Sequence, residues 1–256
     1  MTMSSAALGA TALAGTWGWL ALFGLTDRLS LGSAALAVAY FATAFRLARR
    51  FAFYDKPRPR AWVLTLACAT PLGPFGALRA ASLAAAGTLA DQSVHFTTDP
   101  LSHAATVMFV AFLVSDTVYG LAHYPSQFEL VAGWVHHAVY LVFFALCLRW
   151  RMSAAVALAY PLELTTIVLA LGHIHPPLRS DWLFGGLFLA LRLGYHGAML
   201  RIYVAMRAPP VTLWPFMAAV MVLHVHWFAG WARGMWRRHA PAGEGAHAQR
   251  ATAKRS

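Results

Sequence analysis

Charged residues are scarce in this sequence of 256 residues. They make up 11% of the chain, whereas about 25% is usual for a soluble domain. Acidic residues are the scarcest, with 9 Asp and Glu against 20 Lys and Arg. This shortage excludes an ordinary water-soluble domain, and a hydrophobic content of 59% indicates an integral membrane protein instead.

Cysteine is also rare, since the chain has only Cys68 and Cys147. Both lie inside apolar runs, where a free cysteine behaves as a small buried hydrophobic residue. The sequence therefore gives no disulfide framework, and it does not indicate a redox compartment.

Long apolar runs recur along the whole chain. A helix needs about 20 apolar residues to cross a bilayer, so the sequence predicts an all-α fold, a polytopic transmembrane helical bundle with about 7–8 spans. Pro71 and Pro74 stand inside the third run and are expected to kink it or to break it into two half-helices. The predicted spans are residues 5–25, 30–47, 61–88, 101–122, 128–150, 153–173, 181–206 and 212–236.

The net charge of +11 comes from cations that lie between and after the apolar runs. Nucleic-acid binding would call for a basic patch with interleaved aromatic residues, so we predict no nucleic-acid partner. Because Lys and Arg collect on the cytoplasmic side of a membrane, the groups at 46–60 and 233–255 predict that both termini are cytoplasmic. The first run has no Lys or Arg ahead of it, so we expect a retained span rather than a cleaved signal peptide.

The stretch GWVHHAVYLVFFAL at 133–146 places two adjacent histidines, His136 and His137, in an otherwise apolar run. An ionisable side chain inside a membrane is costly unless something pairs with it or uses it. Asp116 lies about two helical turns before the end of the preceding span, and the histidines lie at a similar depth in their own span. A short loop makes these two helices antiparallel neighbours, so a contact between Asp116 and a histidine is geometrically open.

Other spans carry further polar side chains. Tyr119 shares the helix face of Asp116 at the i+3 position. A single histidine in a span can equally be a hydrogen-bond donor between helices, and Arg192 with Glu163 can be a structural ion pair. The candidates in the last three spans are Glu163, Arg192, His196, His224 and His226.

A metal centre is the weaker interpretation of these histidines. Iron sites in membrane enzymes use histidines on one helix face, with three- or four-residue spacing. No histidine precedes His136 by three or four positions, and the two-residue spacing of His224 and His226 splits them across the helix. We therefore predict no metal and no cofactor.

The pattern resembles the TLC-domain family of polytopic membrane proteins, which includes the ceramide synthases and smaller proteins of membrane-lipid homeostasis. The resembling stretches are FLVSDTVYGL around Asp116, WVHHAVYLVFF with the histidine pair, LELTTIVLALGH with Glu163, the helix of Arg192, and LHVHWFAGWARG. The serine-tyrosine, asparagine and arginine pattern that follows the histidine pair in ceramide synthases is absent, so the chain looks like the smaller branch. The resemblance covers roughly residues 45–236 and implies a TLC-like transmembrane domain there. The apolar runs predict N-terminal transmembrane spans at 1–44, and the Ala/Gly-rich polar composition predicts a disordered basic cytoplasmic tail at 237–256.

The resemblance implies a protein that binds or remodels acyl lipids, in the endoplasmic reticulum or a related membrane. His136, His137 and Asp116 are its expected catalytic residues, and acyl-CoA is a candidate substrate. Three classes compete: an acyl-CoA-dependent N-acyltransferase, a non-enzymatic lipid-trafficking factor and a proton-coupled transporter, and a homo-oligomer is left open. The expected substrate-binding residues are Tyr119, Glu163, Arg192, His196, His224 and Trp227.

Overall fold

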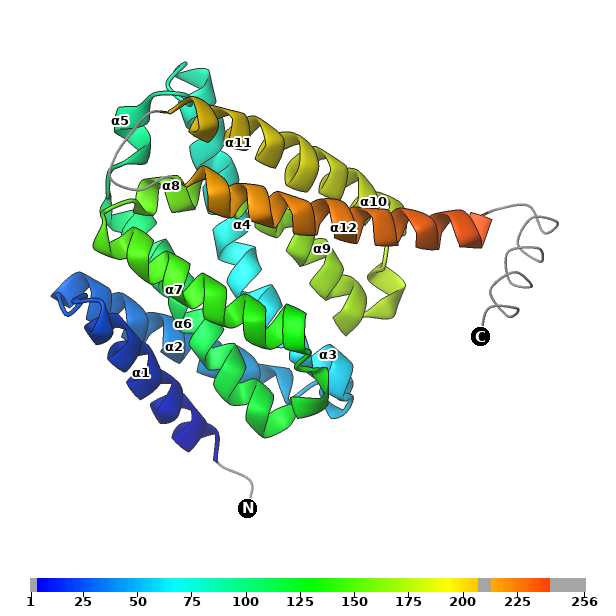
Figure 1. Cartoon of the computed structure of the whole chain (residues 1–256). Coiled ribbons are helices and arrows are strands. Elements are labelled where there is room, and N and C mark those ends of the chain that lie inside the picture. Colours follow the sequence, from blue (N-terminus) through cyan, green and yellow to red (C-terminus); the bar gives the residue numbers. More distant parts are fainter. Residues whose placement is uncertain (1–3, 207–212, 240–256) are drawn as a thin grey trace. The chain divides into compact units, whose positions relative to one another are not determined.

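The computed structural model describes residues 4–206 and 213–239, which form helices joined by short turns (Figure 1). No strand occurs among these residues, and the predicted all-α fold is confirmed. The α-helices are α1 (Ser5–Leu22), α2 (Arg28–Ala48), α3 (Pro57–Ala61), α4 (Val63–Ala85), α5 (Gln92–His95), α6 (Pro100–His123), α7 (His136–Arg149), α8 (Ser153–Ala157), α9 (Glu163–Ile174), α10 (Asp181–Leu187), α11 (His196–Ala205) and α12 (Trp214–His239).

Shorter helical turns and two π-helices connect them. The single turns are η1 (Ala52–Asp55), η2 (Pro125–Gln127), η4 (Tyr160–Leu162) and η5 (Pro176–Leu178). The π-helices are η3 (Leu130–Val135), which runs into α7, and η6 (Phe188–Tyr195), which joins α10 to α11.

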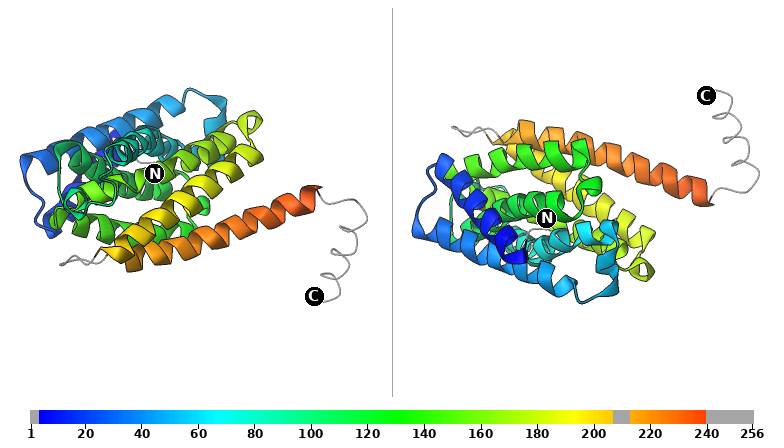
Figure 2. Two further views of the ribbon diagram at one scale, coloured as in Figure 1. Left: turned by 90° about the horizontal axis from the view of Figure 1, so that it is seen from above. Right: turned by 90° about the horizontal axis from the view of Figure 1, so that it is seen from below.

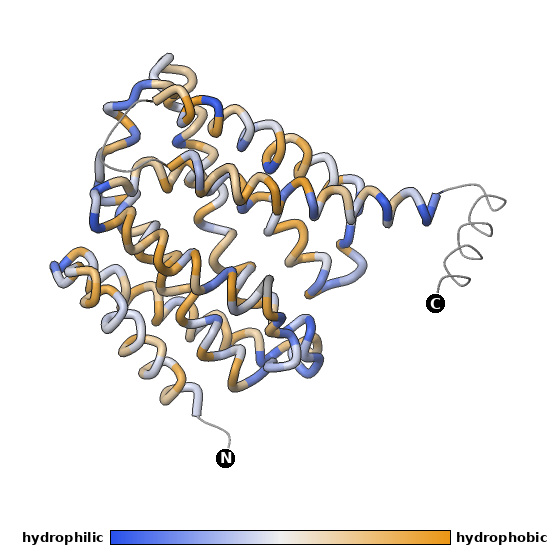
Figure 3. Tube along the Cα trace, in the orientation of Figure 1, coloured by the Kyte–Doolittle hydropathy of each residue, from blue (hydrophilic) through white to orange (hydrophobic). Residues whose placement is uncertain are grey.

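Six helical stretches are long and apolar enough to cross a membrane. The hydropathy pattern follows them, with hydrophobic residues along the helices and hydrophilic residues at many of the turns (Figure 3). The six are Arg28–Ala48, Pro57–Ala85, Pro100–His123, Ser153–Ile174, Asp181–Ala205 and Trp214–His239. The predicted fifth span contains a shorter apolar helix, Gly133–Arg149, and the predicted first span forms α1, so a count of seven to eight stays a prediction.

Aspartate side chains cap the starts of three helices in the first part of the chain. Asp27 accepts the backbone N–H of Ser30 before α2, and Asp99 accepts that of Ser102 before α6; Asp91 caps the short α5 in the same way. An aspartate at this position satisfies N–H groups that the helix leaves without a partner. The Ser30 hydroxyl and N–H hold the pKa of Asp27 below its usual value.

The described chain divides into two compact units between Arg179 and Ser180. In the first unit, α6 is the central helix and packs against α1, α2, α4, α7 and α8 (Figures 1 and 2). Many of its core side chains are apolar and fully buried, such as Phe41 and Phe45 of α2, which pack on Phe112 and Tyr119 of α6. Because α6 lies inside the unit, its polar side chains must find partners on neighbouring helices.

Two glycines of α4 allow a close approach to the start of α9. A Cβ atom on Gly76 would lie 2.6 Å from Cβ of Tyr160 and 2.8 Å from the carbonyl oxygen of Ala157. A Cβ on Gly73 would lie 3.1 Å from the backbone nitrogen of Leu164. Small residues let two membrane helices pack backbone to backbone in this way.

The predicted break falls in a different span. Pro71 and Pro74 lie inside one continuous helix, α4. The expected break into two half-helices is therefore wrong, and the alternative, a kink, stays a prediction. The predicted sixth span is the interrupted one, with α8 separated from α9 by the turn η4. Pro161 lies in that turn, and a proline removes a backbone donor and favours a break.

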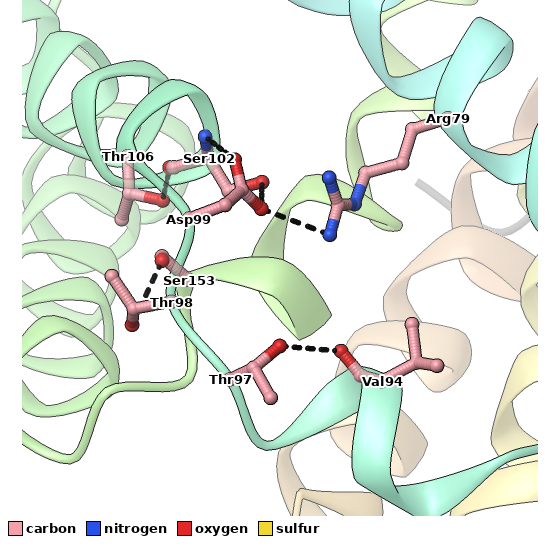
Figure 4. A network of polar contacts seen from close by, with 8 residues as sticks. All are labelled: Arg79, Val94, Thr97, Thr98, Asp99, Ser102, Thr106 and Ser153. Carbon is pink, nitrogen blue, oxygen red and sulfur yellow. Dashed lines mark hydrogen bonds and ion pairs between the residues drawn. The ribbon is translucent and has the colours of Figure 1, made fainter.

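A polar network joins α4, α6 and α8 at one end of the first unit (Figure 4). Arg79 forms a 2.9 Å ion pair with Asp99, and the Ser153 hydroxyl donates to Thr98. Burial opposes ionisation of Asp99, but the Ser102 hydrogen bonds and the Arg79 guanidinium outweigh it and hold the pKa of this carboxyl below its usual value. The network fixes the start of α6.

The second unit consists of α10, η6, α11 and α12. Figures 1 and 2 show α11 and α12 side by side, joined through residues outside the described ranges. Gly185 of α10 lies directly against the Trp231 indole, so a side chain at this glycine would overlap the ring. Arg238 of α12 forms a 3.0 Å ion pair with Asp181 of α10. Helix α12 continues past residue 236 and ends at His239, so residues 237–239, which were expected to belong to the disordered tail, are helical.

The expected disordered tail lies outside the described residues from position 240 onward. The division between residues 44 and 45 rests on the family resemblance, and it stays a prediction.

Candidate functional site

The structure brings Asp116 of α6 and His137 of α7 together inside the first unit. Oδ2 of Asp116 lies 3.5 Å from Nε2 of His137, and the two residues are only 7% and 8% exposed. The short connection through η2 makes α6 and α7 packed neighbours, as expected from the sequence. A carboxyl group and an imidazole therefore face each other in an apolar interior.

Tyr124 completes the carboxyl side of this pair. Its hydroxyl donates a 2.6 Å hydrogen bond to Oδ1 of Asp116. A bond this short is typical of an O–H group that donates to a charged oxygen. Tyr124 is 2% exposed, so water does not compete for the contact.

The opposite edge of the imidazole is held by α6. Nδ1 of His137 lies 2.9 Å from the Thr117 hydroxyl oxygen, and the ring also hydrogen-bonds the Leu113 carbonyl. Thr117 already donates its own hydroxyl hydrogen to that carbonyl, at 2.8 Å. The tautomer with its hydrogen on Nδ1 lets the imidazole donate to these acceptors.

In this tautomer, one proton between Asp116 and His137 satisfies the contact. With Nδ1 protonated, a neutral ring turns the lone pair of Nε2 toward a carboxylate oxygen, which is repulsive unless one proton lies between them. That proton sits either on the carboxyl or on Nε2. In both forms the pair has no net charge, which suits an apolar interior. We call Asp116, His137 and Tyr124 the proton site.

The two adjacent histidines have different surroundings. The His136 ring is half-buried and stacks on Tyr140, with 4.3 Å between ring centroids, while His137 points to Asp116. Adjacent residues on a helix point about 100° apart, which separates their roles. The π-helix η3 ends directly before His136, and π-helical turns are frequent at functional sites because they redirect side chains.

Tyr119 and Glu163, two other predicted site residues of the first unit, make different contacts. Tyr119 packs on Phe45 of α2, and its buried hydroxyl has no hydrogen-bond partner among the described residues. Glu163 is half-buried at the start of α9. No described contact joins either side chain to His137, and their role in substrate binding stays a prediction.

A second polar cluster lies in the second unit. Arg192 donates to Nε2 of His224 at 3.2 Å, so the hydrogen of a neutral His224 is on Nδ1. This Nδ1 lies 3.1 Å from the Arg192 carbonyl oxygen and 3.0 Å from Nδ1 of His196. His196 in turn hydrogen-bonds the carbonyl of Met217. The two buried imidazoles are therefore satisfied as neutral rings beside a guanidinium.

The remaining candidates of α12 are more exposed. Trp227 is 37% exposed and lies 6.0 Å from the His224 ring, and His226 is exposed. The two-residue spacing of His224 and His226 separates them as expected, one inside the unit and one on its surface. Arg192 is half-buried and donates to His224. Its ion pair with Glu163 stays a hypothesis.

No group of three or more His, Cys, Asp and Glu side chains among residues 4–206 and 213–239 is placed to hold a metal ion. Comparison with known proteins adds no constraint, because no family model, curated protein or solved structure matches the chain.

Sequence reasoning missed two residues of this site, Tyr124 and Thr117. Tyr124 follows the last residue of α6 and precedes Pro125. A residue before proline is biased away from the helical conformation, and here the chain turns back so that the phenol reaches Asp116. The dipeptide Tyr-Pro at the end of a span with a buried acid was the available signal.

Proposed function

We propose that this protein binds and remodels acyl lipids inside a membrane, with the proton site as its reactive centre. The observation that supports this is the 3.5 Å contact between Asp116 and His137 in an apolar interior. Buried ionisable groups in membrane helices are expensive and are usually functional. The resemblance to the TLC-domain family supplies the substrate class, and the finer picture of seven to eight spans with cytoplasmic termini in the endoplasmic reticulum belongs to this proposal.

The proposed chemistry is acyl transfer from a thioester to an amine or a hydroxyl group. The attacking group must lose a proton as the new bond to the acyl carbon forms, and the leaving thiolate must gain one as the thioester breaks. A carboxyl and an imidazole that share one proton can supply the second proton and then take up the first. Asp116 and His137 would do this together, while Tyr124 keeps the carboxyl in place.

His136 has a separate part in this proposal. Both nitrogens of His137 already face groups of α6, whereas the half-buried His136 lies one residue away on another face of the same helix. We assign His136 to the bound lipid and His137 to the proton. In this proposal His136 holds the acyl group and His137 transfers the proton, so substrate binding and proton transfer belong to different residues.

The experiment has two stages. Mass spectrometry of lipid that copurifies with the full chain identifies the bound class, and purified protein is then incubated with labelled acyl-CoA and a long-chain amine. We expect product with the wild type and its loss in His137→Ala and Asp116→Asn. His226→Ala and Asp91→Asn are the matched controls, since both residues are exposed and outside the site.

Unchanged turnover in His137→Ala and Asp116→Asn would refute the catalytic role. Bound lipid without any turnover in the wild type would instead identify a lipid-trafficking factor, in which His136→Ala lowers the amount of lipid bound.

A second candidate function, proton-coupled transport, is favoured by one observation. The pair of His196 and His224 is a second buried imidazole cluster beside Arg192. In a transporter, such groups change protonation during each cycle. Reconstituted vesicles with a pH-sensitive dye inside would then show proton movement that His224→Ala abolishes, while acyl transfer would leave the internal pH unchanged.

A further inference from the structure

The connection between α2 and α4 is the most cationic part of the described chain. Residues 46–60, which we call the basic segment, read RLARRFAFYDKPRPR and contain one acid, Asp55. Its two ends overlap the spans Arg28–Ala48 and Pro57–Ala85, so it lies where two membrane helices leave the apolar layer. Figure 3 shows the same region, around α3, as hydrophilic.

Arg60 gives this segment a fixed shape. Its guanidinium donates to the backbone carbonyls of Tyr54, Asp55 and His123 at 2.7, 3.2 and 3.0 Å. It also lies over the Tyr54 ring, 4.6 Å from the centroid. The chain between α2 and α3 is thereby tied to the last residue of α6.

Four other cations of the segment are presented to the outside. Arg46, Arg50, Lys56 and Arg58 are exposed, and their side chains make no hydrogen bond or ion pair to another of the described residues. Arg60 is different, because all of its contacts are made to the protein. Arg49 also contacts the protein, because it donates to the Ser5 hydroxyl at 3.0 Å and lies 5.9 Å from the centroid of the Tyr54 ring. The segment therefore holds two guanidinium groups with protein contacts, Arg49 and Arg60, and four cations that are available to an anion.

Two aromatic side chains stand beside these cations. Phe51 is 59% exposed and stacks on Phe53, with 5.8 Å between ring centroids and 11° between the planes. An exposed phenylalanine is unfavourable in water but stable among lipid chains. Cations with an adjacent apolar pair match a lipid headgroup, in which a phosphate lies just above hydrocarbon.

We propose that the basic segment binds the phosphate groups of anionic phospholipids. Basic residues just outside a membrane helix attract such lipids, and each cation raises the affinity by a factor of about five. The exposed Phe51 favours a lipid over a soluble phosphate compound, because a soluble anion makes no use of an apolar side chain. This proposal is independent of the proton site and of any acyl transfer.

The test uses the full chain in mild detergent, titrated with phosphatidylserine or phosphatidylcholine and followed by native mass spectrometry. The triple variant R50Q/K56Q/R58Q removes three exposed cations of the segment and keeps Arg60. The matched control, R149Q/R151Q/R201Q, removes three other exposed cations. Removing these cations can also invert the topology of the chain in the cell membrane. Both faces of the protein are accessible in detergent, so an inverted but folded variant does not change the lipid affinity that is measured.

We expect the wild type and the control to prefer phosphatidylserine, and R50Q/K56Q/R58Q to bind it about 100-fold more weakly. Phe51→Ser should weaken phosphatidylserine binding while leaving the net charge unchanged. Equal binding by all proteins would overturn the proposal and leave the cations as a topology signal. Equal losses of phosphatidylserine binding in the two triple variants would show an effect of net charge alone. Displacement of phosphatidylserine by inorganic phosphate at matched concentration would indicate a soluble ligand. Each of these two results would also overturn the proposal.

Discussion

Three buried tyrosines allow the hydrogen bonding at the proton site to be tested by one chemical change. Tyr119, Tyr124 and Tyr160 are 1%, 2% and 2% exposed, so Tyr→Phe removes a single buried oxygen in each case. Their hydroxyls differ in what they contact. Tyr124 donates to the Asp116 carboxyl at 2.6 Å, Tyr160 donates to the Thr106 hydroxyl at 3.4 Å, and Tyr119 has no partner among the described residues.

The expected stabilities follow this order. Loss of a hydrogen bond to a charged group costs about 1.5–3 kcal/mol, so Tyr124→Phe should lower the free energy of unfolding by that amount. The long bond of Tyr160 is at the weak end, about 0.5 kcal/mol. Tyr119→Phe removes a polar atom without a partner and should be neutral or stabilising by up to about 1 kcal/mol.

The assay is thermal unfolding of the purified chain in one detergent. For a chain of this size we expect Tyr124→Phe to lower Tm by about 3–12 °C, while Tyr119→Phe leaves it unchanged or raises it. Equal losses for Tyr119→Phe and Tyr124→Phe would refute the assignment of the Asp116 hydrogen bond. If Tyr119 contacts bound lipid, as the sequence predicts, its variant should lose lipid without losing stability.

Three further predictions concern packing, pH and the second unit. Gly76→Ala should destabilise the first unit by about 1–3 kcal/mol because the new methyl group overlaps Tyr160, whereas Gly32→Ala, with open space around it, should not; Tm of the two variants decides. The lowered pKa of Asp99 stabilises the folded state fully above its unfolded value of 3.8, and this contribution is lost as the pH falls through the folded pKa. Asp99→Asn should therefore show a smaller loss of Tm below pH 3.8 than the wild type, and an equal loss would contradict the ion pair. His224→Ala leaves buried partners of the second unit unsatisfied, at a cost of about 1–3 kcal/mol, and should speed amide hydrogen exchange in α11 and α12 more than His226→Ala does.

The meeting of Asp116 with the histidine pair was open to prediction because it depends on depth and connectivity. Both quantities can be read from the sequence, since the rise per helical residue is constant and a short loop enforces antiparallel packing. Which histidine meets the carboxyl was not predictable. The π-helix η3 turns the following residues by an amount that the apolar pattern does not record.

The position of the broken span was also beyond the sequence. Pro71 and Pro74 are stronger breaking signals than the single Pro161, yet α4 is continuous and the break falls between α8 and α9. A proline in a membrane helix is tolerated where neighbouring groups satisfy the freed backbone. That compensation depends on tertiary packing, and a single sequence does not reveal it. Pro71 leaves the carbonyl of Ala67 without its helical donor, and the Tyr40 hydroxyl of α2 donates to this carbonyl at 3.0 Å.

The hydrogen bond from Arg60 to the carbonyl of His123 spans 63 positions of the chain. The last carbonyls of a helix need donors from elsewhere, and α6 takes one from a residue that is synthesised well before it. The end of the central helix thus depends on a side chain from the connection between α2 and α4. Without Arg60, the His123 carbonyl would lose this donor.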